Sequence, residues 1–524
     1  MPIRMDVPGQ VWTRRGFLAA GGAAFVAWPL LGRPESAFAL RQSTSPDYPF
    51  ALGVASGDPA PTGIVLWTRL APKPLEGGGM PEENIEVRWE VADDDKFAKV
   101  VAKGTAVATP DLAHSVHIEV NGLEPSRWYF YRFAAMNEIS PVGRTRTAPR
   151  PEEIPQKLRF AFASCQSFEG GYYTAYDHMR HEDLDLIAHL GDYIYEAAGN
   201  PKRMRVHVGP RLEELSHYRN RHAQYKTDEY LQAAHALCPW LVTWDDHEFA
   251  NNCAGEISEK KDETPEWYLG RRANAYKAYY EHMPLRAAHL PKGPDLKLYR
   301  NIPFGRLAEF QVLDTRQYRT DQPCGDGNKA PCEGTYDPKG TLLGDTQEKW
   351  LYDTLKATKG TWNVLTQQVM MARVDRVPDE PVGYSMDQWP GYEVNRQRIL
   401  KFFAEHPGLN PIVITGDIHN NWANNLQVDC GDETSPVVAT EFVGTSISSG
   451  GDGAETTKTT AAVLRENPFV KFYNNERGYV SCEVTPESFT SHYRTVPYVE
   501  KPGAPLVTRK SFVVEAGRPG LNEV

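Results

Sequence analysis

The sequence predicts a two-part fold, an all-β sandwich followed by a larger α/β layered domain. Residues 48–148 contain short apolar segments, alternating or rich in aromatics, that are divided by Gly, Pro, Asp and Asn. This pattern is typical of antiparallel strands joined by turns. From residue 157 onward, apolar strand-length runs alternate with long helical patterns, which is typical of a layered α/β domain. The length of 524 residues also favours more than one domain.

The first part, residues 40–150, is expected to form an immunoglobulin-like or fibronectin-like sandwich. Its strand candidates include residues 63–70, 85–94, 114–123 and 127–135, and about seven short strands over about a hundred residues fit that architecture. A stretch rich in proline and charge then runs to about residue 156 and is interpreted as a linker.

The second part, residues 157–515, supplies the layered pattern. Strands are expected at residues 158–165, 184–192, 240–248, 307–316, 362–372, 411–419 and 437–446, and helices at 173–182, 215–237 and 344–358. In such folds ligands gather at the carboxyl ends of the strands.

Residues 1–39 are interpreted as an export signal rather than as structure. Arg14 and Arg15 stand directly before an apolar run from Phe17 to Leu31, and Ala37-Phe38-Ala39 follows. The run would be about 22 Å long as a helix, which is too short for a bilayer core of about 30 Å. The paired arginines indicate a twin-arginine signal with a peptidase site behind it. We therefore expect a periplasmic or secreted protein that meets the twin-arginine translocase during export; a short membrane anchor is the alternative.

The charge balance limits the classes of partner that the protein is expected to bind. There are 57 basic and 68 acidic side chains, for a net charge of −11, which argues against nucleic acid as a partner. A phosphorylated substrate remains compatible, because a bound metal inverts the local field. No later run is long enough for a stable membrane anchor.

Seven cysteines in an oxidising compartment favour pairing and leave at least one thiol over. Cys324 and Cys332 flank a turn-rich loop and are the first candidates for a disulfide. Cys238 with Cys253, and Cys430 with Cys482, are weaker candidates. Cys165 is the thiol left over.

Four strand candidates end in side chains that bind metals. Cys165 ends the first, and Asp192 ends the second with Tyr195 close behind. The third and fourth strands are followed by Asp245, Asp246, His247, Glu248, Asn251 and Asn252, and by Asp417 and His419. Taken singly, each has a plain structural explanation, a turn or helix cap for the Asp and core packing for the Cys.

The four strand ends together favour a metal site. So many buried charges in one chain would be costly without a cation to neutralise them. A thiolate, a phenolate and an imidazole suit a transition metal, whereas carboxylates also suit calcium or magnesium. A mixed cluster with a bridging aspartate is therefore plausible, and metal-assisted phosphoester hydrolysis is the reaction class that fits it.

At this point the motifs resemble a known family. "FASCQ", "HLGDYIYE", "WDDHE…NN", "LDTRQYR", "GYEVNRQRIL" and "TGDIHNNWANNL" occur in order and together resemble the bacterial alkaline phosphatase D family, which includes certain secreted phospholipases D. The resemblance implies a calcineurin-like metallophosphoesterase domain, related to purple acid phosphatases, that holds one ferric ion with calcium; zinc and manganese are the alternatives.

The resemblance also implies roles for single residues. Cys165, Asp192, Tyr195 and His419 would surround the iron. Asp192 would bridge to calcium, with Asp417 and either Asp246 or Asn252 as further ligands. Asp246 stands where the wider group usually has Asn, and Ser164-Cys165-Gln166 replaces its usual Asp-x-His.

Substrate contacts are implied in the same way. His247 would contact the phosphate or protonate the leaving alkoxide while a metal-activated hydroxide attacks in line. Asn252 is a second candidate for substrate binding. Arg219 is a third, with an exposed helical position as the alternative interpretation.

The predicted function is a secreted, metal-dependent alkaline phosphatase acting on monoesters and diesters. A phosphodiesterase or phospholipase D with the same metal site is the first alternative. An extracellular binding protein with structural metals is the second, although structural calcium sites need neither a thiolate nor a phenolate.

Overall fold

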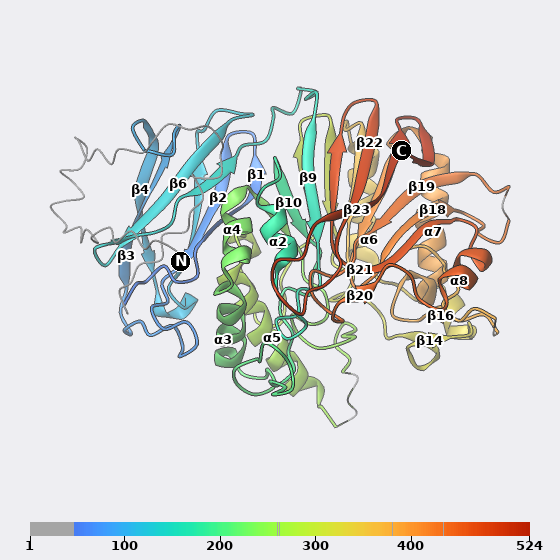
Figure 1. The fold of residues 1–524 in the computed structure, drawn as a ribbon, viewed down its shortest axis with the longest axis horizontal. Helices are drawn as coiled ribbons and strands as arrows, with labels where there is room; N and C mark the ends of the chain where they lie inside the picture. The colour runs from blue at the N-terminus through green and yellow to red at the C-terminus, as the bar shows by residue number, and fades with distance from the viewer. Residues whose placement is uncertain (1–46, 259, 261, 380, 433) are drawn as a thin grey trace.

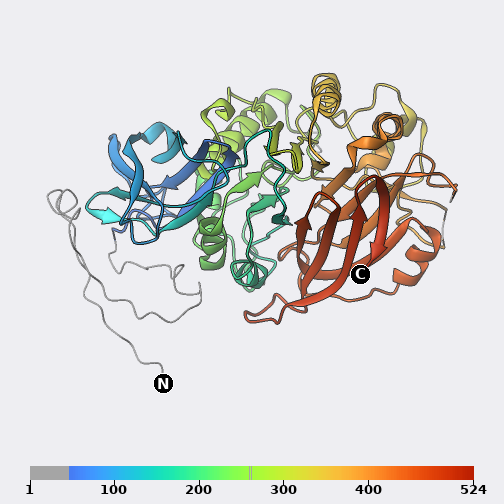
Figure 2. The same ribbon diagram turned by 90° about the horizontal axis from the view of Figure 1, so that it is seen from above.

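The computed structural model describes residues 47–524 apart from 259, 261, 380 and 433. The predicted export signal, residues 1–39, lies outside this range. Along the long axis the chain runs from the blue amino-terminal strands, through the green helices, to the orange and red carboxyl-terminal strands (Figures 1 and 2). Among the described helices, none is both long and apolar enough to cross a membrane.

The amino-terminal region consists of two sheets that share one core. Val54, Leu66, Val91 and Tyr131 are among the buried residues of that core. The first sheet contains β1 (Val54–Ala60), β2 (Gly63–Arg69) and β5 (Ser115–Asn121). The second contains β3 (Ile85–Ala92), β4 (Val100–Ala108), β6 (Trp128–Ala135), β7 (Glu138–Ile139) and β8 (Gly143–Arg146).

The amino-terminal region is not a separate body, because β1 also pairs with the larger region. Gly57 of β1 lies beside Trp240 in a parallel pairing. A Cβ at Gly57 would lie 2.9 Å from the Trp240 carbonyl oxygen and 2.4 Å from that of Pro284, so only glycine permits this approach. The first amino-terminal sheet therefore continues into the sheet that carries the site.

The larger region contains two mixed sheets. The first continues from β1 through β11 (Trp240–Val242), β10 (Leu186–His189), β9 (Leu158–Ala163), β21 (Val470–Val484), β22 (Ser488–Val496), β23 (Val507–Glu515) and β24 (Arg518–Glu523). The second runs β12 (Arg300–Phe304), β13 (Ala308–Val312), β15 (Trp362–Thr366), β17 (Pro411–Thr415), β19 (Val437–Val443) and β18 (Asn421–Gln427). The seven strands predicted from the sequence are confirmed as β9, β10, β11, β13, β15, β17 and β19.

Strand β21 joins the two sheets. Its first half pairs with β18, for example Tyr473 with Trp422, and its second half pairs with β9, for example Val480 with Phe162. The inner faces of the two sheets pack on each other through residues such as Phe162, Phe310 and Phe442. Strands β10, β13, β15 and β17 are buried on both faces because helices cover their outer faces.

The helices form two outer layers. Residues that alternate with the inner ones, such as Ala161 and Val242, pack under the first helix group, and Leu365 and Val413 pack under the second. The first group is α2 (Thr174–Met179), α3 (Leu215–Lys226), α4 (Glu229–Leu237) and α5 (Pro265–His282). The second is α6 (Gly344–Ala357), α7 (Glu393–Glu405) and α8 (Thr460–Glu466). The fold is therefore a layered α/β arrangement, as predicted.

One helix prediction needs correction. The sequence predicted a single helix over residues 215–237, but the chain breaks after Lys226. The Asp228 side chain accepts hydrogen bonds from the backbone N–H groups of Tyr230 and Leu231 and so caps a new helix, α4. The break orients α4 toward the amino-terminal sheets, where it packs against β1.

Candidate metal centre

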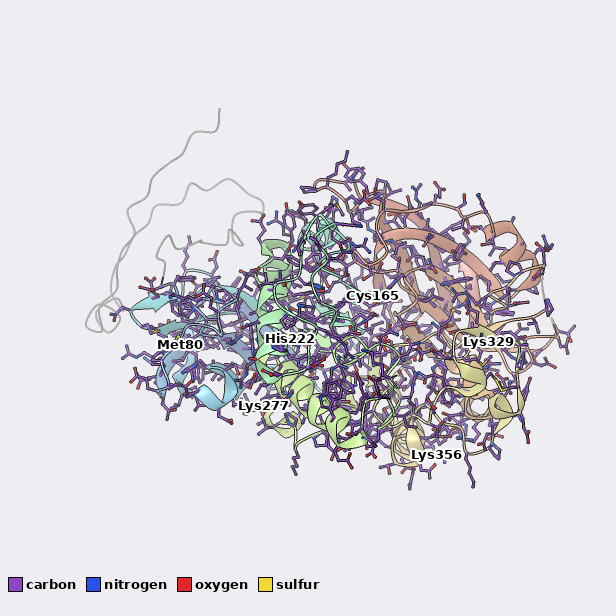
Figure 3. The ribbon with its side chains drawn as sticks, turned by 90° about the horizontal axis from the view of Figure 1, so that it is seen from below. Met80, Cys165, His222, Lys277, Lys329 and Lys356 are labelled. Atoms are coloured by element: carbon purple, nitrogen blue, oxygen red, sulfur yellow. A yellow bond between two sulfur atoms is a disulfide. The ribbon has the colours of Figure 1, made fainter. Side chains whose placement is uncertain are left out.

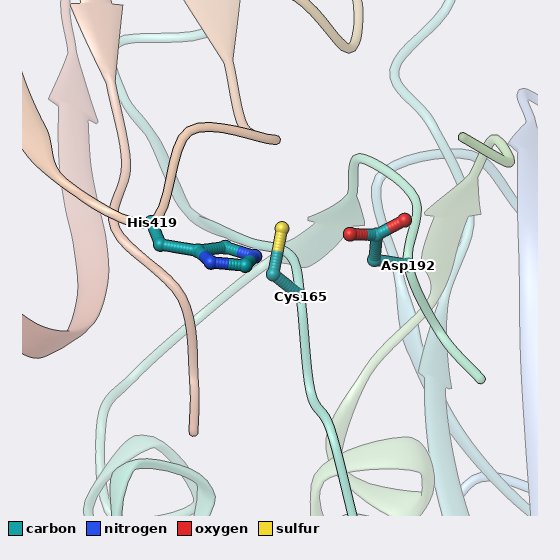
Figure 4. A group of neighbouring side chains, drawn as sticks. All are labelled: Cys165, Asp192 and His419. Carbon is teal, nitrogen blue, oxygen red and sulfur yellow. The ribbon is translucent and has the colours of Figure 1, made fainter. Parts of the chain in front are cut away.

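The ends of four strands meet at one place in the interior. Cys165 follows β9, Asp192 follows β10, Asp246 follows β11 and His419 follows β17. Cys165 lies in the middle of the molecule (Figure 3). The carboxylate of Asp192 and the imidazole of His419 flank its thiol from opposite sides (Figure 4).

These residues form three overlapping groups whose ligand atoms lie within 4.8 Å of one another. The groups are Cys165–Asp192–His419, Asp192–Asp246–His247 and Asp245–Asp246–Asp417. Asp192 and Asp246 each belong to two groups, so the three are one continuous cluster, here called the metal cluster. Asp192 belongs to both the Cys165 group and the His247 group, which is the position that a carboxylate bridging two metal ions needs.

The backbone at the strand ends is strained. Cys165, Asp192, Asn252, Asp417 and His419 all have positive φ, between 48° and 65°. A non-glycine residue in this region costs about 1–3 kcal/mol and persists where the surroundings impose it. Five such residues in or beside the metal cluster indicate that the fold accepts a cost in stability to hold these side chains in place.

The glycines that precede the aspartates are required by close packing. A Cβ on Gly191 would lie 2.4 Å from the backbone nitrogen of Asp245, and one on Gly416 would lie 2.5 Å from the Ser164 hydroxyl. The two Gly-Asp pairs therefore occur where neighbouring strand ends approach each other.

Tyr195 also reaches the cluster. Its hydroxyl donates to Oδ2 of Asp192 at 3.0 Å and lies 3.3 Å from Nε2 of His419. Ser449 donates to the same hydroxyl at 2.6 Å. Tyr195 therefore presents its oxygen to the Cys165–Asp192–His419 group.

Burial shapes the protonation of this group. Burial raises the pKa of the Cys165 thiol and of the Tyr195 phenol, and the nearby Asp192 carboxylate raises both further. Burial and the Arg477 guanidinium lower the pKa of His419 to about 3, which leaves its imidazole neutral. A neutral imidazole is ready to bind metal, whereas the thiol and phenol need a cation before they lose their protons.

The pKa values of the carboxylates also indicate that the cluster needs a cation. Burial raises the pKa of Asp192, with Asp246 adding to the effect, and burial raises the pKa of Asp417 to about 6. Burial also opposes ionisation of Asp246, but Arg316 and His247 outweigh it and lower its pKa. The protein alone therefore does not supply enough positive charge to ionise the whole cluster.

His247 belongs to the metal cluster and has a partner that the sequence prediction missed. Its Nδ1 lies 2.7 Å from Oε2 of Glu196, and its ring stacks on Tyr195 at 4.1 Å. Burial lowers the pKa of His247, but the carboxylates of Glu196, Asp246 and Asp192 outweigh it, so the pKa is raised. Glu196 belongs to "HLGDYIYE" but carried no signal of its own, because its role depends on a contact 51 residues away in the chain.

Arg316 is the second residue that the sequence prediction missed. Its guanidinium donates to Asp245, to both oxygens of Asp387 at 2.8 and 2.9 Å, and to Asp417 at 3.1 Å. Gln388 donates to the other oxygen of Asp417 at 2.7 Å. The motif "LDTRQYR" contains this arginine. Its acidic partners are 71 or more residues away in the chain, so the motif alone did not identify them.

The cluster fits bound metal ions. Oδ2 of Asp245 and Oδ1 of Asp246 are buried without a hydrogen-bond partner, and an unsatisfied buried carboxylate oxygen is costly. A thiol, a phenol, an imidazole and several carboxylates together are a donor set for a transition metal next to a harder cation.

Asn252 lies at the edge of the cluster. Its backbone N–H donates to Oδ2 of Asp246 at 2.6 Å, while its side-chain NH₂ donates to Asp326 at 2.6 Å. The structure thus brings Cys165, Asp192, Tyr195, Asp246, His247, Asp417 and His419 together, with Asn252 beside them. Their individual roles stay predictions.

Arg219 forms an ion pair with α5. Its guanidinium donates to Glu281 on α5 at 2.7 Å and to the carbonyl of Asp111 at 2.8 Å. The Glu281 side chain is fully buried, so this arginine neutralises a buried charge. The ion pair favours a structural role, and substrate binding by Arg219 stays a prediction.

The cysteine predictions were right once and wrong twice. Cys324 and Cys332 form a disulfide with a Cα–Cα distance of 5.9 Å. The other five thiols are free. Cys238 lies just before β11 and Cys253 in the segment between β11 and α5, while Cys482 packs between the sheets and Cys430 beneath the second helix group.

Comparisons with known proteins agree with the geometry. The PhoD-like phosphatase family matches residues 160–493, and the PhoD-like phosphatase N-terminal domain family matches residues 35–149. Alkaline phosphatase D of Bacillus subtilis (strain 168) is 50% identical over 525 residues, covering 98% of this chain and 90% of that protein.

A solved structure is equally similar. A protein described as "Structure of PhoD" is 51% identical, with a TM-score of 0.89 over 92% of this chain and 93% of that one. Both parts of the sequence, the four strand ends included, lie within these matches. The chain belongs to the PhoD-like phosphatase family.

Proposed function

We propose that this phosphatase is exported and hydrolyses phosphate monoesters and diesters with a metal cluster at the ends of β9, β10, β11 and β17. The observation that carries the proposal is the convergence of a thiol, a phenol, two imidazoles and four aspartates, with carboxylate oxygens that lack a partner. Near-full-length similarity to alkaline phosphatase D supports the reaction.

The proposed cluster holds one ferric ion with calcium. Cys165, Asp192, Tyr195 and His419 are the proposed iron ligands, and Asp192 is the bridge. Asp246, Asp417 and the amide oxygen of Asn252 are the proposed calcium ligands. Bound metal ions would supply Lewis-acid charge for the phosphoryl oxygens and activate the attacking water.

His247 is the proposed proton donor to the leaving alkoxide. Glu196 holds Nδ1 of the imidazole, so Nε2 is the nitrogen that remains for the substrate. The surrounding carboxylates raise the pKa of His247 against its burial, and this keeps the ring protonated until it donates. Glu196 is therefore a positioning residue for His247.

Export and domain organisation are proposed on the sequence pattern. Residues 1–39 would be a twin-arginine signal, residues 40–150 an immunoglobulin-like sandwich and residues 157–515 the catalytic domain, in a periplasmic or secreted protein. The two packed sheets between Val54 and Arg146 support the second assignment.

The test is hydrolysis by the purified exported protein. We expect it to cleave p-nitrophenyl phosphate and bis(p-nitrophenyl) phosphate, and exhaustive chelation to abolish both activities. Phosphatidylcholine is assayed in parallel, since a preference for it would indicate a phospholipase D. Full activity after the metal has been removed would refute the proposal.

A further inference from the structure

The loop that is closed by the disulfide reaches the metal cluster. Within this loop, β14 (Asn328–Lys329) pairs with β16 (Tyr384–Ser385), and the backbone N–H of Met386 donates to the carbonyl of Gly327 at 2.9 Å. The Cys324–Cys332 bond closes the same short segment. The tip that contains Asp326 is therefore fixed from both sides.

The loop touches the cluster through Asn252. Oδ2 of Asp326 accepts a hydrogen bond from Nδ2 of Asn252 at 2.6 Å. Gln322, which lies just before the loop, donates to the backbone carbonyl of Asn252 and to Asp387, both at 2.8 Å. One side chain of the loop and one from the segment before it thus hold a residue that itself donates to Asp246.

These contacts decide which way the Asn252 amide faces. A carboxylate accepts hydrogen bonds, so the NH₂ of the amide must face Asp326. The oxygen and the nitrogen of an amide are bonded to the same carbon and diverge from it, so this hydrogen bond leaves the oxygen available to another partner.

We propose that Asp326 is a positioning residue of the metal centre, and that the disulfide-closed loop keeps the amide oxygen of Asn252 directed at the bound cation. This inference rests on the proposed function, because it takes Asn252 as a calcium ligand. Partners of ligands typically change metal affinity by about 10–100-fold when they are removed. The disulfide then serves the metal centre rather than only the stability of a surface loop.

The experiment measures calcium binding by the full exported protein, by equilibrium dialysis against buffered calcium. We expect Asp326→Ala to weaken calcium binding about tenfold and to leave iron content unchanged. Asp326→Asn retains an acceptor oxygen, so its calcium affinity should lie within about threefold of the wild-type value. The matched control is Glu333→Ala, which removes an exposed carboxylate just after Cys332 and should bind calcium as the wild type does.

The disulfide is tested by replacing Cys324 and Cys332 with Ser. We expect weaker calcium binding, and we expect Asp326→Ala to add little in that background, since both changes release the same amide. This pair also carries the test if Asp326→Ala does not fold. Unchanged calcium affinity in both variants would overturn the inference, whereas a wild-type protein without calcium would instead refute the proposed cofactor.

Discussion

Two buried polar clusters lie side by side in this protein, and they differ in chemistry. The metal cluster lies at the strand ends. A second cluster, here called the histidine cluster, is formed by buried side chains of β10, α3, α4 and α5. It consists of His189, His222, His235, His282 and Lys226. Consecutive residues connect the two, because Asp192 belongs to the first while the Tyr193 hydroxyl lies 2.8 Å from Nε2 of His235.

Burial disfavours charge in both clusters, but the histidine cluster consists of bases and the metal cluster mainly of acids. Burial lowers the pKa of every residue of the histidine cluster, so these side chains avoid charge, and its imidazole rings stack. His222 stacks on His282 at 4.9 Å, and His235 stacks on Trp240 at 3.8 Å. In the metal cluster, by contrast, several buried carboxylates are held together beside a thiol, and burial raises the pKa of Asp192 and Asp417. Buried polarity alone therefore does not mark a site; buried acids and a thiol that need a cation do.

Loss of the bridging carboxylate should have the largest effect on activity. Asp192→Ala removes the residue shared by two groups of the metal cluster, and we expect hydrolysis of p-nitrophenyl phosphate to fall by about a thousandfold or more. Elemental analysis of the variant should show loss of metal. A variant with its full metal content would show that Asp192 is not the bridge.

Loss of the proton donor should have the next largest effect. We expect His247→Asn to reduce kcat by about a hundredfold, with a larger loss for an alkyl phosphate than for a nitrophenyl ester, because the poorer leaving group needs the proton. Glu196→Gln should produce the same pattern with a smaller loss. Equal losses on both esters would remove His247 from that role.

The histidine cluster should affect stability rather than catalysis. The pKa of His189 is lowered by burial from 6.5 to about 3. Below pH 6.5 the unfolded chain therefore binds a proton that the folded chain does not. Stability from this residue is complete above pH 6.5 and is lost as pH falls toward 3.

The variant His189→Phe keeps the stacking on Trp240 and removes the titration. We expect its free energy of unfolding to fall less between pH 7 and pH 5, by about 2 kcal/mol, than that of the wild type. Denaturant titrations at both pH values measure this difference. A metal content or kcat below half of the wild-type value would break the division between the two clusters.

The smallest effect on activity is expected for Arg219→Ala. The change leaves the buried Glu281 without its partner, which should cost about 3 kcal/mol of stability. We expect kcat/KM at 25 °C to remain within twofold of the wild-type value. A rise in KM of tenfold or more would instead support Arg219 as a substrate-binding residue.

The sequence allowed good prediction of whatever depends on neighbours in the chain. Seven strands of the two mixed sheets were predicted because each is a continuous apolar run. Cys165, Asp192, Asp246 and His419 were found because they follow such runs closely. The Cys324–Cys332 bond was found because the two cysteines are only eight positions apart and flank a turn-forming sequence.

Prediction failed where a residue acts through distant partners. Glu196 and Arg316 look like ordinary charged residues until β11 and β17 bring His247 and Asp417 to them. The thiols of Cys430 and Cys482 were paired on composition, but they belong to different cores. The carboxyl-terminal strands β21–β24 were also missed, since their half-exposed faces give a weak pattern.

The most direct test of the central claim is the metal content of the exported, folded protein, measured by elemental analysis after gel filtration. We expect about one iron per chain with calcium bound beside it, as the thiol, phenol and carboxylate donors require. Both metals should be lost together with hydrolytic activity in Asp192→Ala. A protein that hydrolyses phosphate esters at full rate without stoichiometric metal would contradict the account.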